Sequence, residues 1–125
     1  MRKIQLSLSL LLLMGFSASY ADDMELLVNS SPRQRAESQT RFMRTQLGLS
    51  DEKTSETQAI NLKFAEMAEP IIKGSGLSTI KKLQMKSILD QKDEQLRHVF
   101  TAQQFELYEN SKNELLNALK SDLAQ

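Results

Sequence analysis

Few side chains in this sequence could carry out chemistry on a bound molecule. The 125 residues include one histidine and no cysteine, which excludes a disulfide, a thiolate zinc site and a cysteine nucleophile. His98 shares a helix face with Glu94, four residues before it. One such pair is a weak metal site, so we expect a histidine that is solvent-exposed or faces a partner, no bound metal and no cofactor.

The remaining polar residues do not form a catalytic pattern. The carboxylate pairs at 51–52 and 93–94 are adjacent in sequence, so their side chains point in different directions on a helix. The glycines at 74–76 lack the lysine of a phosphate-binding loop. His98 could activate a serine only through a tertiary contact. We therefore expect no enzymatic activity.

The N-terminus has the pattern of a secretory signal peptide. Arg2 and Lys3 precede an apolar stretch that includes residues 10–16, and small residues stand at the −3 and −1 positions of a cleavage site after Ala21. We expect cleavage there, with an uncleaved N-terminal anchor as the alternative, and no later segment that could span a membrane.

Removal of this segment changes the charge of the chain. The precursor has sixteen basic and sixteen acidic residues, and loss of Arg2 and Lys3 leaves 104 residues with fourteen basic side chains and a net charge of −2. This balance argues against a protein that binds nucleic acid by neutralising phosphates.

Apolar spacing predicts four helices and no strand. Residues 22–35 show no sustained period and are expected to form a flexible leader, and residues 36–123 form the helical domain. The second helix is expected to end or kink near Glu69 because Pro70 lacks an N–H. The apolar positions are Ala36, Thr40, Met43 and Leu47, then Ile60, Phe64, Met67, Ala68 and Ile71, then Ile80, Leu83, Met85, Ile88, Leu89, Leu96 and Val99, and finally Phe105, Tyr108, Leu115, Leu119 and Leu123.

These narrow stripes and short links predict an all-α fold, with four helices in an extended antiparallel hairpin array. Lys92 interrupts the third stripe, where its alkyl stem could cover apolar surface. A thin helical layer of this kind would leave one face exposed or in contact with a partner.

Two helix starts carry clear capping signals. Ser50 is a good N-cap for the second helix. Thr101 and Gln104 form a capping box, in which each side chain can bond the other residue's backbone N–H. Phe100 and Phe105 flank this box and can form a hydrophobic staple.

The two capped segments share an order of residues. Leu49-Ser50-Asp51-Glu52-Lys53 and Phe100-Thr101-Ala102-Gln103-Gln104 each place an apolar residue, a hydroxyl cap and a long polar residue at the same spacing. Behind a signal peptide, this pair resembles the two Leu-Thr-x-x-Gln motifs of the Spy/CpxP family of periplasmic proteins. Ser50, Lys53 and Phe100 depart from the motif, whereas Leu49, Thr101 and Gln104 match it.

The resemblance implies a cradle-shaped helical homodimer in the periplasm. Members are associated with envelope stress, and some hold unfolded proteins without ATP. The alternative is a regulatory module that modulates one envelope partner, such as a sensor kinase. For polypeptide binding, Phe42 and Leu62 lie off the main stripes, and Arg41 and Arg44 form a small basic patch beside Phe42.

Overall fold

The computed structural model describes the backbone of residues 20–76 and 78–125, and side chains from residue 25 onward. Within these residues the chain forms helices and links, with no strand, which confirms the all-α prediction. None of the described helices is long and apolar enough to cross a membrane. The helices are α2 (Tyr20–Asn29), α3 (Pro32–Leu47), α4 (Asp51–Lys73), α5 (Ser78–Val99), α6 (Ala102–Asn110) and α7 (Lys112–Leu123).

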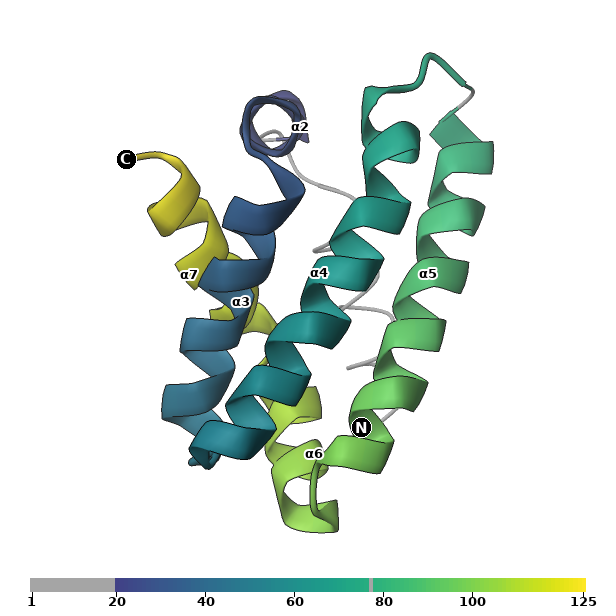
Figure 1. The fold of residues 1–125 in the computed structure, drawn as a ribbon. Helices are drawn as coiled ribbons and strands as arrows, with labels where there is room; N and C mark the ends of the chain where they lie inside the picture. Colours follow the sequence, from purple (N-terminus) through teal and green to yellow (C-terminus); the bar gives the residue numbers. More distant parts are fainter. Residues whose placement is uncertain (1–19, 77) are drawn as a thin grey trace.

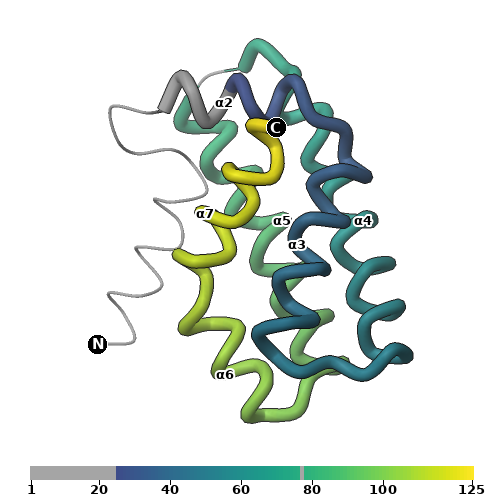
Figure 2. Tube along the Cα trace, turned by 90° about the vertical axis from the view of Figure 1, so that its left-hand side faces the viewer, coloured from purple at the N-terminus to yellow at the C-terminus, as the bar shows by residue number. Residues whose placement is uncertain are grey.

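Four helices stand side by side in the order α7, α3, α4, α5, and neighbours in this row run in opposite directions (Figure 1). α3 packs on both α4 and α7, and α5 packs on α4. α2 crosses one end of the row and contacts α4 and α7. α6 connects α5 to α7 at the other end, as a second view shows (Figure 2).

Two apolar clusters hold this row together. The first lies around α6 and joins the ends of α3 and α5 through Met43, Leu47, Leu49, Leu96, Phe100, Phe105 and Tyr108. The second joins α4 to α5 through Phe64, Ala68, Ile72 and Ile88. The first cluster contains the apolar residue of each capped segment, Leu49 and Phe100.

The predicted caps are present. The Ser50 side chain accepts a hydrogen bond from the Lys53 N–H, and Thr101 and Gln104 form the reciprocal capping box. Phe100 and Phe105 are both buried in the first cluster, where each ring packs against Tyr108. Gly48 ends α3 in the left-handed conformation, with φ 64°.

The structure differs from the sequence prediction over residues 22–35, where a flexible leader was expected. α2 occupies much of this segment, and α3 begins at Pro32 rather than near Ala36. Ser31 and Gln34 form a second capping box at the start of α3. The guanidinium of Arg35 is buried and donates to the Leu27 and Ser30 carbonyls and to Glu69 on α4. These tertiary bonds, rather than local periodicity, fix α2.

The second helix does not end near Glu69, which was one of the two outcomes expected from Pro70. α4 continues past Pro70 to Lys73, and Ile72 is buried in the second cluster. Proline removes only one bond of the helical ladder here, and burial of Ile72 offsets it. The helix then ends at Gly74, where a β-carbon would lie 2.8 Å from the Pro70 carbonyl oxygen.

Some predicted apolar positions are on the surface. Met67, Ile80 and Leu83 are exposed. The buried face of α4 includes two polar residues, Thr57 and Asn61. A buried face predicted from apolar residues alone is therefore wrongly centred on this helix. The second cluster includes Met85 and Ile88 of α5 but neither Ile80 nor Leu83.

The last predicted helix divides in two. α6 ends at Asn110 and α7 begins at Lys112, with Ser111 between them at φ −105° and ψ 8°. The described residues therefore contain six helices where the sequence predicted four.

Candidate functional site

The described residues form an apolar groove with a volume of about 110 Å³. α5 and α7 form its two walls, α3 and α4 form its floor, and residues of α2 and α6 lie at its ends. Its apolar lining comprises Leu26, Leu27, Phe64, Ala65, Ala68, Ile72, Met85, Ile88, Leu89, Leu115, Leu116, Leu119 and Leu123. Ligand sites in proteins commonly have this composition, with a few polar groups among apolar ones.

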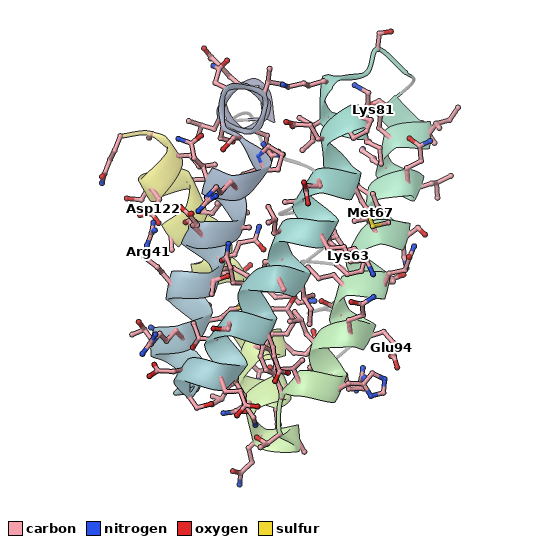
Figure 3. The ribbon with its side chains drawn as sticks, in the orientation of Figure 1. Arg41, Lys63, Met67, Lys81, Glu94 and Asp122 are labelled. Carbon is pink, nitrogen blue, oxygen red and sulfur yellow. The ribbon has the colours of Figure 1, made fainter. Side chains whose placement is uncertain are left out.

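The groove exists because the two end helices of the row do not close on each other. α5 is fixed to α4, and α7 is fixed to α3. On the α3–α7 side, Asp122 accepts hydrogen bonds from Ser38 (2.6 Å) and Arg41 (2.9 Å). The hydrogen bonds from Ser38 and from Arg41 lower the pKa of Asp122 below its usual value. Figure 3 shows Arg41 and Asp122 together at this edge.

A buried lysine lies in the groove. Lys92 on α5 is only 6% exposed, and its Nζ donates to Gln39 Oε1 on α3 at 3.0 Å. Burial lowers the pKa of Lys92 to about 8, against the raising effect of Asp93 and with a further lowering effect of Lys112. The alkyl stem was expected to cover apolar surface, but the ammonium itself is inside.

Beside Lys92, Asp93 joins α5 to α6 and α7. Its carboxylate accepts a hydrogen bond from the Tyr108 hydroxyl (2.6 Å) and pairs with the Lys112 ammonium (2.6 Å). Burial raises the pKa of Tyr108 well above its usual value, and the adjacent Asp93 raises it further. Tyr108 is thus a neutral donor at neutral pH, and both oxygens of the Asp93 carboxylate are already bound, Oδ1 by Tyr108 and Oδ2 by Lys112.

One further polar group lies at the floor of the groove. Asn61 is 1% exposed, and its Nδ2 donates to Thr40 Oγ1 at 3.0 Å. Its Oδ1 has no hydrogen-bond partner among the described residues. A buried acceptor of this kind is usually satisfied by a bound donor.

The structure brings the two capped segments together, although they are far apart in sequence. Lys53 Nζ, at the start of α4, donates to Gln104 Oε1 at 3.3 Å. Gln104 Nε2 donates to the Leu47 carbonyl, also at 3.3 Å. The last motif position of each copy, Lys53 and Gln104, therefore ties the α3–α4 link to the start of α6.

The residues predicted to bind polypeptide lie apart from the groove lining. Arg41 and Arg44 are exposed and form ion pairs with Asp122 and Asp51, respectively. Phe42 and Leu62 are half-buried rather than exposed. None of the four lines the groove.

His98 is exposed, with its Nε2 3.5 Å from Glu94 Oε1, as the spacing predicted. The described residues contain no group of three or more histidine or acidic side chains that could hold a metal ion.

The important site residues that the sequence analysis missed are Lys92, as a buried charge, together with Gln39 and Asn61. All three lie on faces that pack against other helices, and the only sequence signal was the interruption of an apolar stripe by Lys92. No family model, curated protein or solved structure matches the chain.

Proposed function

We propose that the protein binds apolar segments of unfolded polypeptides in the groove, without ATP, as a chaperone-like protein of the cell envelope. The observation that carries the proposal is the open apolar groove between α5 and α7. Flexible side chains such as Met85 suit a site that accepts different sequences, because they can repack around each one.

The proposed relation to the Spy/CpxP family has one supporting contact. The two capped segments meet through Lys53 and Gln104, so the repeated motif serves a common structural purpose at one end of the groove. We accordingly propose that the antiparallel row of helices is a cradle of the kind that this family implies.

We also propose that the protein acts in the periplasm as a homodimer, after cleavage following Ala21. Exposed apolar side chains on the α4–α5 side, including Met67 and Leu83, are available for pairing. Light scattering across micromolar concentrations tests the dimer, and a monomer at every concentration would exclude it.

The experiment for the proposed function measures light scattering of an aggregating, chemically unfolded client. The purified chain should slow aggregation in the absence of ATP. Leu116→Gln places a polar group in the groove wall, where Leu116 is half-buried, and should weaken this protection several-fold.

Leu107→Gln is the matched control, because Leu107 is 49% exposed on α6 and lies outside the groove. It should protect the client as the unchanged protein does. Equal protection by both variants would exclude the groove as the binding site. Capture of one stoichiometric partner from envelope extracts, with no protection of clients, would favour the regulatory alternative.

A further inference from the structure

Lys92 is a buried cation without an ion-pair partner in the described part of the chain. No carboxylate there lies within 4.0 Å of its Nζ, and the only hydrogen bond recorded for this ammonium is to the neutral amide of Gln39. An ammonium has three donors, so two remain to be satisfied. Isolated buried charges are costly, and proteins usually pair them.

The acids that pair with the other cations of the groove lining are already engaged. Asp93 is bound by Tyr108 and Lys112, at 2.6 Å each. Glu69 pairs with Arg35, and Glu109 pairs with Lys112. None of these acids can turn to Lys92 without breaking an existing bond.

Two of the cations that line the groove are already paired, Arg35 with Glu69 and Lys112 with Asp93. Lys92 has no carboxylate of the described residues within 4.0 Å of its Nζ. A wholly apolar guest would exclude water from Lys92 and supply nothing in its place. A guest that carries one carboxylate would supply the missing counter-ion, and charge complementarity of this kind favours one guest over another.

A second unpartnered group points to a polypeptide guest. Asn61 also lines the groove, and its Oδ1 lacks a donor; because this oxygen is inaccessible in the empty groove, its amide must turn toward the groove to meet a guest. A peptide N–H is a suitable donor, and a hydrocarbon chain has none. Together, Lys92 and Asn61 provide one site for a carboxylate and one for a backbone amide.

We propose that the groove selects apolar polypeptide segments that contain one Asp or Glu, whose carboxylate pairs with the Lys92 ammonium while Asn61 accepts a backbone N–H. This inference rests on the proposed function, because it names the class of segment that the same groove prefers.

The test uses two fluorescent apolar peptides, acetylated and amidated at their ends, that differ only in a central Glu or Gln. Fluorescence anisotropy gives their affinities for the purified chain. The Glu peptide should bind about tenfold more tightly, a difference of about 1.4 kcal/mol. Lys92→Met should remove this preference and leave the Gln peptide bound about as before, whereas Lys92→Arg should retain the preference.

The outcomes separate the two proposals. Equal binding of both peptides to the unchanged chain would overturn the selection of acidic segments and leave the groove as a general apolar site. Binding of neither peptide would overturn the proposed function as well. If dodecanoate binds and neither peptide does, the groove is a lipid site and both proposals are wrong.

Discussion

At the residue scale, Lys92 stands out because a side chain that normally carries a charge in water is buried here. The ordinary lysine pKa is 10.5, and in the folded protein it is about 8. The unfolded chain therefore binds more protons than the folded chain between these two values. Stability should rise with pH in this window, because the folded state no longer holds a charged ammonium.

Lys92→Met should raise the free energy of unfolding at pH 7, since it replaces an unpaired buried charge with an apolar side chain of similar length. The unchanged chain should gain stability between pH 7 and 9.5, and the variant should gain much less. Urea unfolding at several pH values in this range measures both. The raised pKa of Tyr108 adds an opposing effect only above pH 10, where tyrosines of the unfolded chain ionise. A variant less stable than the unchanged chain at pH 7 would contradict this account of Lys92.

Asp122 makes stability rise with pH in the acidic range, as Lys92 does in the alkaline range, but here the folded state stabilises the charged form. Its pKa is lowered in the folded protein, so its stabilising effect is present above the ordinary value and is lost as pH falls through the folded one. Asp122→Asn should cost about 0.5–1.5 kcal/mol at neutral pH, and the difference should narrow at pH 3. Asp90→Asn, which affects an exposed pair with Lys86, is the control and should cost less. If Asp122→Asn lowers the free energy of unfolding by the same amount at pH 3 as at neutral pH, the ionised carboxylate is not the source of the stabilisation.

The sequence predicted residue environments only where they depend on near neighbours. The solvent exposure of His98 follows from a single helix face. The burial of Lys92 and Arg35 depends on contacts with Gln39 and Glu69 on other helices, and no local pattern contains that information.

At the element scale, helix starts were the most predictable features. The Thr101–Gln104 capping box is complete within four residues, so its chemistry can be read without the fold. The same pattern at Ser31 and Gln34 could have been found in this way, but it precedes a helix whose first turn has little apolar periodicity. Pro70 and Ser111 were misjudged because tertiary packing decides whether a helix continues.

Thr101→Ala should lower stability by about 1 kcal/mol through loss of the cap, with a fall in Tm of about 4–8 °C. Thr45→Ala, at an exposed position inside α3, is the matched control and should be neutral or slightly stabilising, because alanine has the higher helix propensity. Thermal unfolding followed by circular dichroism compares them. Equal melting temperatures for the two variants would show that the cap contributes little.

At the scale of the whole molecule, the all-α class could be predicted, but the groove could not. Its walls come from α5 and α7, and its floor comes from α3 and α4. Apolar stripes indicate that each helix has a buried side without showing that two of them leave a space between them. The residues of α3 and α4 that the sequence predicted to bind polypeptide therefore do not line the groove.

The proposed export makes a prediction about the mature chain. Protein recovered from the cell envelope should begin at Asp22, and intact-mass measurement should show the loss of the first 21 residues. Full-length protein retained in the membrane fraction would instead support an N-terminal anchor.

Site-specific crosslinking tests most directly whether clients lie in the groove. A photoreactive side chain at Leu116, in the groove wall, should crosslink an unfolded client, and the same group at the exposed Leu107 should not. Both proteins should first show unchanged circular dichroism. Crosslinks from position 116 alone are the predicted result, and crosslinks from position 107 alone, or equally from both, would contradict the account.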